Sequence, residues 1–475
     1  MAVEVGTRAT PGPGRRGSLA LIGERRRDAL GMFVGLRDRY GDVVRFRMGP
    51  LDMLMVTDPA LVQEVFTTHA SRVRKGRILE GAKVLLGEGL LTSEGDHHRR
   101  QRRLMQPAFH RERLDAYAGV MGAWAARTAA GWSDGAVVDV FSEMTGLTMG
   151  VTGEALFGTD VAADRERVES ALVDVFRAFD LLVLPFGGAR MRVPTRTVRR
   201  FRAAKADLEA MIDDVIARRR REGGDRGDLL SMLLAARDED PRRPDAERSE
   251  AAAPAQEGSL TAGNGSHDGA RMTDEEVRHE VMTLFAAGLE TTANALTFAW
   301  WLLAGDAAAR ARLEAEADAL PGPPGSLADL ERLPWTAAVL DEAFRLDPPA
   351  WMLARRCVEP FVLGGHEVPE GTLVMTPPCL LHRDGSRWPR AREFEPGRWL
   401  DGGGPPHRFC YLPFGAGTRK CIGSGFALAE GTIALAAIAR THRLERLPDH
   451  TLELAPQITL RPRGGLPMRV EARRS

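Results

Sequence analysis

The sequence predicts a mainly α-helical protein with a small β region. Its longest helix begins at the capping box Thr273–Glu276 and continues to about Leu303, which is roughly thirty residues and about 45 Å. Residues 111–235 also follow a mostly helical pattern. Val43–Met48 and Met53–Val56 predict two paired strands joined by a Gly-Pro turn. Most of the chain is therefore expected to be helical.

Composition limits the class of protein. The chain has 475 residues, and 65 Lys and Arg balance 65 Asp and Glu. A net charge near zero argues against a general nucleic-acid binder. The four cysteines form no CxxC pair, and they fit neither a disulfide framework nor a zinc site.

The N-terminal segment has no signal-peptide pattern, because the apolar piece Leu19–Ile22 is short and lies between arginines. Residues 1–16, which include Pro11–Gly14, predict a flexible tail. Met32–Tyr40 and Pro59–His69 predict short helices on either side of the strands. We expect a monomer in the cytoplasm without an integral membrane segment.

Residues 238–270 have a different composition from the rest of the chain. They are rich in Ala, Pro, Glu, Gly and Ser and contain almost no large apolar residues. Such a segment cannot bury enough surface to become ordered. We predict a disordered insertion within a single domain that spans residues 1–475.

A basic run lies at Gly95–Arg103. Basic clusters are commonly solvated helix faces. His98 and Arg102, however, are four residues apart and share one face of the predicted helix.

The apolar part of the longest helix, residues 281–304, has two interpretations. It could span a membrane, because it carries a single charge and contains Trp300-Trp301. Glu290 would then lie near the bilayer centre at a cost of about 3 kcal/mol. The alternative, which we favour, is the central helix of a large globular core.

A glycine-rich stretch surrounds the last cysteine and reads Phe414-Gly-Ala-Gly-Thr-Arg-Lys-Cys421-Ile-Gly423, directly before a helix. Glycines let the backbone approach a flat ligand closely. The helix N-terminus and Arg419 are both expected to favour a thiolate. A thiolate in a tight loop is a strong axial donor for haem iron, whereas an isolated cysteine beside a glycine turn is commonly a packing residue.

With every position of Phe-Gly-x-Gly-x-Arg-x-Cys-x-Gly present, the stretch resembles the haem-binding loop of the cytochrome P450 family of haem-thiolate monooxygenases. The resemblance extends along the chain. Ala287-Gly288-x-Glu290-Thr291-Thr292 resembles the family's oxygen-binding motif, and Glu342-x-x-Arg345 with Arg398 resembles its buried structural triad. It implies the cytochrome P450 fold, with haem between the long central helix and the cysteine loop.

The resemblance also implies roles for individual residues. Cys421 is the expected axial ligand of the iron, and Glu290 and Thr291 are expected to handle protons. The other residues expected to contact haem b are His98, Arg102, Arg356, Arg419, Ala287, Gly288, Phe414, Gly415 and Gly423.

The implied reaction inserts one oxygen atom of O2 into a lipophilic substrate, by hydroxylation or epoxidation. Electrons from NAD(P)H are expected through a separate ferredoxin or flavodoxin with its reductase, because no such module is fused to the chain. Two alternatives remain open. One is a peroxide-driven haem peroxygenase, which usually lacks the acid–alcohol pair, and the other is a non-enzymatic haem sensor or electron carrier.

Overall fold

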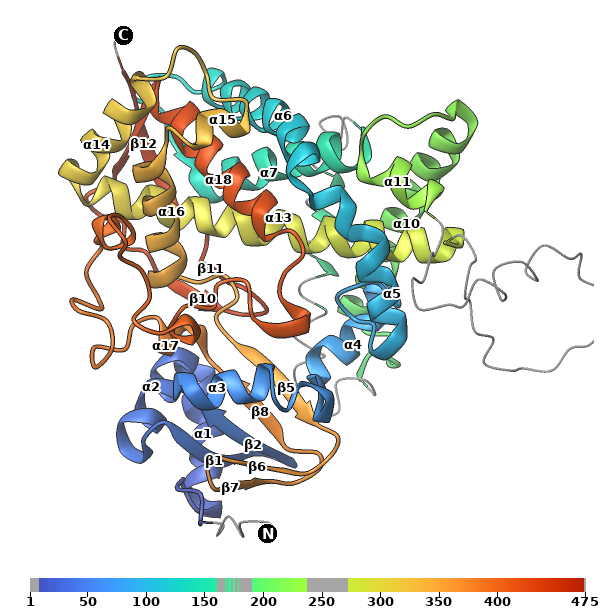
Figure 1. Cartoon of the computed structure of the whole chain (residues 1–475), viewed down its shortest axis with the longest axis vertical. Coiled ribbons are helices and arrows are strands. Elements are labelled where there is room, and N and C mark those ends of the chain that lie inside the picture. Colours follow the sequence, from blue (N-terminus) through green and yellow to red (C-terminus); the bar gives the residue numbers. More distant parts are fainter. Residues whose placement is uncertain are drawn as a thin grey trace, which may run out of the picture.

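The computed structural model describes residues 8–159, 190–236 and 272–473, with several positions between 167 and 178. Figure 1 shows a helical body beside a smaller part built on a β-sheet. The mainly helical fold with small sheets is confirmed. The predicted insertion at 238–270 lies outside the described residues, as does part of the predicted helical region before residue 190.

The helices of the body share a layered arrangement around one central helix. They are α4 (Arg77–Leu86), α5 (Gly95–Met105), α6 (Arg111–Ala130), α7 (Val140–Phe157), α10 (Arg196–Glu222), α11 (Leu229–Ala235), α13 (Asp274–Ala304), α14 (Ala307–Asp318), α15 (Leu327–Leu330), α16 (Pro334–Leu346) and α18 (Ser424–Ala439).

The central helix is α13, which crosses the middle of the molecule in Figure 1 and packs against α7, α10, α16 and α18. Its N-terminus is the predicted capping box, in which Glu276 N–H donates to Thr273 Oγ1 and Thr273 N–H donates to the Glu276 carboxylate. Most side chains between Val277 and Trp300 are buried against these helices. The long apolar helix is thus a core helix, as the favoured interpretation predicted. Within the part of the chain that the structure describes, no helix combines the length and apolar character needed to cross a membrane.

The main sheet joins strands from both ends of the chain in the order β1-β2-β8-β5-β3. The two predicted N-terminal strands are β1 (Val43–Met48) and β2 (Leu51–Val56), which pair antiparallel. β8 (Leu373–Thr376) runs parallel to β2, and β5 (Leu353–Cys357) pairs antiparallel with both β8 and β3 (Val73–Lys75). This sheet therefore places Arg355 of β5 next to Lys75 of β3, which lies far earlier in the sequence.

Shorter pairings complete the β region. They are β6 (Phe361–Leu363) with β7 (His366–Val368), β10 (Leu454–Pro456) with β11 (Leu460–Pro462), and β12 (Pro467–Ala472) between β4 (Val137–Asp139) and β9 (His442–Arg446). The β10–β11 pair is a short hairpin near the end of the chain, and it packs against α13.

The N-terminal segment is more ordered than expected. Arg8 N–H donates to the Gly365 carbonyl oxygen at 2.9 Å, and Arg45 N–H donates to the Pro11 carbonyl oxygen at 2.8 Å. Helix α1 begins at Arg15, within the segment expected to be a tail. The described residues from Arg8 onward are thus tied to the sheet by backbone hydrogen bonds that composition alone does not predict. The remaining short helices of this part are α2 (Ala29–Tyr40), α3 (Pro59–Phe66) and α17 (Pro378–Leu381).

A buried ion-pair network holds the segment that leads toward the cysteine loop. Arg345 donates to both carboxylate oxygens of Glu342 at 2.8 Å, and neither side chain is exposed. Arg345 also donates to the carbonyl oxygens of His382 and Ala391. Arg398 Nε donates to Glu342 at 3.0 Å. The predicted structural triad is therefore formed, and it ties α16 to the irregular chain on either side of Arg398.

Candidate active site

The predicted haem ligand lies in a tight loop before α18. Gly415 and Gly417 both adopt a φ of 67°, a region that favours glycine. A Cβ atom at Gly417 would lie 2.2 Å from the carbonyl oxygen of Phe66. Cys421 N–H donates to the Phe414 carbonyl oxygen at 2.9 Å and closes the loop. Together these contacts hold the cysteine in one position.

Cys421 is exposed, whereas the other three cysteines are buried. Desolvation nevertheless raises the pKa of the Cys421 thiol, against smaller opposing effects of the Gly423 backbone, Arg102 and Lys420. The sequence predicted that the helix N-terminus and Arg419 favour a thiolate, whereas burial has the largest effect on the pKa of this thiol and acts in the opposite direction. A bound metal cation reverses the balance, since a coordinated thiol loses its proton.

A strip of small residues interrupts the burial of α13. Ala287, Gly288 and Thr291 are half-buried, although most of the helix around them is buried. They fall on one face at helical spacing. A Cβ atom at Gly288 would approach Thr152 to 3.4 Å. The strip is therefore open on one side and closely packed on the other, and its small side chains leave room for a ligand.

Thr291 already has a partner for its proton. Its hydroxyl donates to the Ala287 carbonyl oxygen at 2.8 Å, four residues back along α13. This is the common arrangement for a threonine within a helix. The oxygen keeps lone pairs that can accept a further hydrogen bond.

Glu290 is buried and faces the β10–β11 hairpin. Thr459 Oγ1 donates to Glu290 Oε1 at 2.7 Å, and a guanidinium nitrogen of Arg461 lies 3.8 Å from the same oxygen. Burial raises the pKa of the Glu290 carboxyl, while Thr459 and Arg461 act in the opposite direction. This acid can hold a proton at a pH where an exposed carboxyl has lost it.

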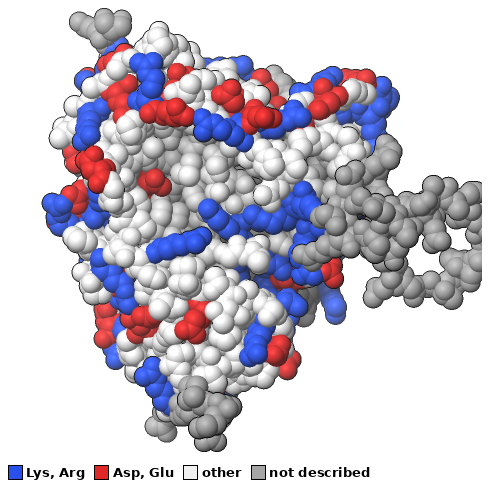
Figure 2. All heavy atoms as spheres, viewed as in Figure 1, with Lys and Arg blue, Asp and Glu red and all other residues white. Residues whose placement is uncertain are grey.

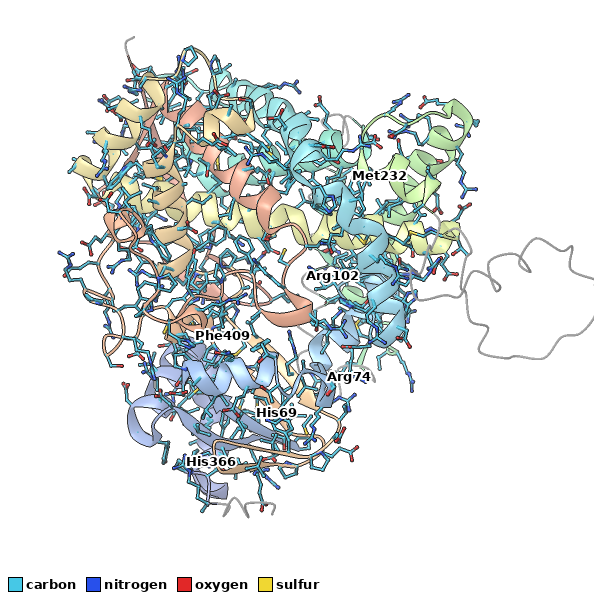
Figure 3. All side chains as sticks on the ribbon, viewed as in Figure 1. His69, Arg74, Arg102, Met232, His366 and Phe409 are labelled. Atoms are coloured by element: carbon cyan, nitrogen blue, oxygen red, sulfur yellow. The ribbon has the colours of Figure 1, made fainter. Side chains whose placement is uncertain are left out.

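Positive side chains gather at one edge of the molecule's central hollow. A cavity of about 890 Å³ is lined by α5, the end of the loop before β3, and the cysteine loop, and its walls include His98, Arg102 and Arg419. Figure 2 shows Lys and Arg as a blue band across the middle of this face. Figure 3 labels Arg102 on α5 with Arg74 below it.

These positive groups lie close enough to disfavour one another's charge. Burial, followed by Arg419, Lys75 and Arg102, lowers the pKa of His98 to about 3. Burial and Arg419 lower the pKa of Arg355 to about 10. Two acids act on this group: Glu94, which pairs with Arg419, and the buried Glu280, whose charge acts on Lys75. Such a concentration of positive charge favours a ligand that carries several negative charges.

The structure corrects one residue in this group. Arg355 and Arg356 are neighbours on β5, so they point to opposite faces of the strand. Arg356 donates to Glu80 at 3.1 and 2.8 Å. Arg355 lines a small cavity with Arg419, and its guanidinium lies 4.8 Å from the ring centre of Phe66. The arginine that joins the cluster is Arg355, not Arg356.

The remaining predicted residues support the loop. The Phe414 and Phe344 rings meet edge to face, with centres 5.1 Å apart. Gly423 precedes the first residue of α18. Arg102 Nη1 donates to the Lys420 carbonyl oxygen at 2.7 Å and so joins α5 to the cysteine loop.

Sequence reasoning missed Lys75, Arg355 and Thr459. Lys75 is buried, donates to the carbonyl oxygens of Leu90 and Ser93 at 2.8 Å each, and lies in the positive cluster. Burial, more than the nearby arginines, lowers its pKa to about 7. The only available signal was that lysine is scarce in this sequence. Successive side chains of β5 point to opposite faces of the sheet, so the strand's pairing register, had it been known, could have distinguished Arg355 from Arg356.

The donor set fits haem b. Cys421 is an exposed thiol, α13 presents small half-buried residues, and the positive cluster suits a pair of carboxylates. In Figure 1 the loop that enters α18 lies below α13, and α18 packs against that helix. These residues therefore suit a flat dianionic group: the thiol could bind its metal, the small residues of α13 could lie against one face, and the positive cluster could bind its carboxylates.

Comparison with known proteins extends these observations to nearly the whole chain. The sequence model of the family described as Cytochrome P450 matches residues 11–465. The chain is 38% identical to cyclooctatin synthase of Streptomyces melanosporofaciens over 432 residues, 90% of this chain and 88% of that protein. It is 35% identical to pentalenene oxygenase of Streptomyces avermitilis over 88% of this chain and 87% of that protein. It is also 35% identical to cyclooctat-9-en-7-ol 5-monooxygenase of Streptomyces melanosporofaciens, over 88% of this chain and 86% of that protein.

Proposed function

The chain belongs to the cytochrome P450 family and is a haem-dependent monooxygenase, and from this premise we propose that it oxidises a cyclic terpene hydrocarbon or terpene alcohol. The observation that carries the proposal is the similarity, at 35–38% identity over most of both chains, to enzymes named for such substrates. The small apolar strip on α13 supports it, because a terpene has a large apolar surface and no charge.

Cys421 is proposed as the axial ligand. Haem b, when bound, supplies the reduction of O2 and the transfer of one oxygen atom to the substrate. The loop fixes the position of the cysteine, and its positive-φ glycines let the backbone lie close to a flat ring. Rigid support of this kind keeps the donor atom in place without further reorganisation.

The carboxylates of the cofactor are proposed to bind the positive cluster of His98, Arg102, Arg355 and Arg419. Arginine–carboxylate hydrogen bonds are strong and directional. Their negative charge would also oppose the combined effect of burial and neighbouring positive charge, which lowers the pKa of Arg355 and of His98. Arg356 is not included, because its guanidinium pairs with Glu80.

On α13, the small Ala287 and Gly288 leave space for substrate and O2, and Thr291 and Glu290 manage protons. The Thr291 oxygen can accept a hydrogen bond while its own O–H donates to the Ala287 carbonyl oxygen. Glu290 provides a buried carboxyl that can release a proton. The acid–alcohol pair favours the O2-dependent monooxygenase over the peroxide-driven alternative.

The electron donor is proposed to be an acidic ferredoxin or flavodoxin that docks over the basic hollow beside the cysteine loop. Arg74, Arg99, Arg102 and Arg103 line this hollow. Clustered positive charge steers an acidic partner and makes its association sensitive to salt. Figure 2 shows this concentration of positive charge on the same face.

The test is turnover by the haem-loaded protein with NADPH, a ferredoxin and its reductase, against a panel of cyclic terpenes. We expect a terpene to shift the haem spin state and to yield a hydroxylated or epoxidised product that depends on NADPH. Binding of fatty acids or polyketides but no terpene would overturn the substrate class. Product formed with hydrogen peroxide and not with NADPH would support the peroxygenase.

A further inference from the structure

The hairpin formed by β10 and β11 brings its tip against the acid of α13. In Figure 1 the hairpin lies below α13, and β11 packs against that helix. The tip is itself fixed, because Trp351 Nε1 donates to the Gln457 carbonyl oxygen at 2.8 Å and Leu460 N–H donates to the Pro349 carbonyl oxygen at 2.9 Å. The hairpin therefore presents its side chains to the helix from a braced backbone.

Both hairpin contacts reach the same oxygen of Glu290. Thr459 Oγ1 donates to Oε1 at 2.7 Å, and Arg461 lies 3.8 Å from Oε1. Asn294, one turn further along α13, donates to Thr459 Oγ1 at 3.5 Å. Oε2 takes none of these contacts, so it is the oxygen available to carry a transferable proton.

The Glu290–Arg461 pair leads from the interior toward the surface. The Glu290 side chain is 9% exposed, whereas that of Arg461 is 28% exposed. Burial raises the pKa of Glu290, and the Thr459 hydrogen bond and the Arg461 charge oppose that rise. A proton donor has to release its proton as well as hold it, and those two groups favour release.

Other groups around this part of α13 do not supply a comparable charge. From α7, Thr148 donates to the Leu289 carbonyl oxygen. From α18, the buried acid Glu430 contacts Thr292. Among the residues that the structure describes, Arg461 is the cation paired with Glu290.

We propose that Thr459 and Arg461 are positioning residues for proton transfer by Glu290, an inference that rests on the proton role given to Glu290 in the proposed function. Thr459 holds Oε1 in place. Arg461 stabilises the carboxylate that remains when the proton leaves, and its exposed part lies where water can return a proton to the carboxyl. One proton is released and one is regained from solvent in each cycle, so the acid ends as it began.

The experiment compares Arg461→Gln and Thr459→Val with the unaltered haem-loaded protein. Both changes remove a group that stabilises the carboxylate, so Glu290 should keep its proton to higher pH. The alkaline fall in turnover should move to higher pH. Product per NADPH should decrease by about tenfold, less than the roughly hundredfold that a general acid typically provides. Arg461→Lys retains the charge and should restore much of the loss.

Infrared titration gives a readout that does not depend on activity. The protonated carboxyl band that disappears in Glu290→Gln identifies Glu290, and this band should titrate at higher pH in Arg461→Gln. The matched control is Arg463→Gln, since Arg463 lies two residues along the same chain and pairs with Glu453 at 3.4 Å on the exposed surface. It should change neither the band nor the pH profile.

The outcomes separate this inference from the proposed function. An unchanged band and pH profile in both hairpin variants would overturn the inference. So would effects of Arg461→Gln that persist in the Glu290→Gln background, because they would show that the hairpin acts on packing alone. Failure of the unaltered protein to bind haem or consume NADPH counts against the proposed function, whereas the infrared titration still tests the hairpin.

Discussion

Cys421 carries the least replaceable role proposed for a single side chain. Cys421→Ser should abolish the thiolate absorption of the carbon-monoxide-bound ferrous protein, because a hydroxyl is not the same strong anionic donor. The difference spectrum of the haem-loaded variant measures this. Cys410→Ser, at a buried position, should leave the absorption intact. A thiolate spectrum that survives Cys421→Ser would show that another residue is the ligand.

The neighbouring arginines of β5 provide a second residue-scale prediction. Arg355→Gln should weaken haem affinity by about tenfold or more, since a hydrogen bond to a charged group contributes roughly 1.5–3 kcal/mol. Arg356→Gln should leave affinity nearly unchanged, because its partner is Glu80. Titration of the apoprotein with haem compares the two. Equal losses would mean that both arginines contribute to the cofactor site.

The Thr291→Ala variant tests whether the Thr291 hydroxyl does more than form a hydrogen bond within its own helix. Thr291→Ala removes a hydrogen bond to the Ala287 carbonyl oxygen and an acceptor in the proposed site. The variant should retain haem, the thiolate spectrum and substrate affinity, but it should release more hydrogen peroxide per product formed. The ratio of product to NADPH measures the coupling. An unchanged ratio would assign Thr291 a structural role only.

At the scale of elements, the cysteine loop depends on a buried charge network distant from it in sequence. Glu342→Gln leaves the fully buried Arg345 without its counter-charge. Breaking such a pair typically costs about 3–5 kcal/mol, so the midpoint of urea unfolding should fall. Loss of the thiolate spectrum should accompany unfolding, because the same network holds the chain on either side of Arg398.

The control for that change is an ion pair at the surface. Glu331→Gln disrupts the exposed pair with Arg111, whose side chains are 67% and 75% exposed. Such pairs contribute about 0–1 kcal/mol, so its midpoint should stay near that of the unaltered protein. Similar losses in both variants would contradict the special importance of the buried network.

At the scale of the whole molecule, charge is unevenly distributed even though the net charge is zero. Arg103→Glu combined with Lys420→Glu should slow reduction by an acidic ferredoxin without changing substrate affinity, because encounter depends on the local field. Stopped-flow reduction at several salt concentrations measures this. Arg39→Glu, an exposed change on α2, should have little effect. Reduction that responds to neither the reversals nor salt would place the docking surface elsewhere.

Much of the fold follows from local signals. The capping box and apolar pattern define α13, and alternating apolar residues define β1 and β2. These signals are local because helix and strand periods require only neighbouring residues. Likewise, the spacing of residues from Phe414 to Gly423 identifies the cysteine loop, because all residues of this motif lie within ten positions of one another.

Other features depend on contacts between distant parts of the chain. Residues 8–16 look like a tail by composition, yet backbone hydrogen bonds to Arg45 and Gly365 order their described part. Likewise, the pairing of β3 with β5 places Lys75 opposite Arg355. No local pattern encodes such a pairing, because a strand's neighbour is chosen by the whole sheet.

The sequence by itself determined the family and the long central helix, and it predicted the ligand cysteine and the acid–alcohol pair, because each of these signals lies in residues close together along the chain. Only the tertiary structure decided that Arg355 and not Arg356 joins the positive cluster, that burial raises the pKa of the Cys421 thiol, and that Thr459 and Arg461 contact Glu290. The physical reason is that side-chain direction, desolvation and ion pairing depend on atoms brought together by folding.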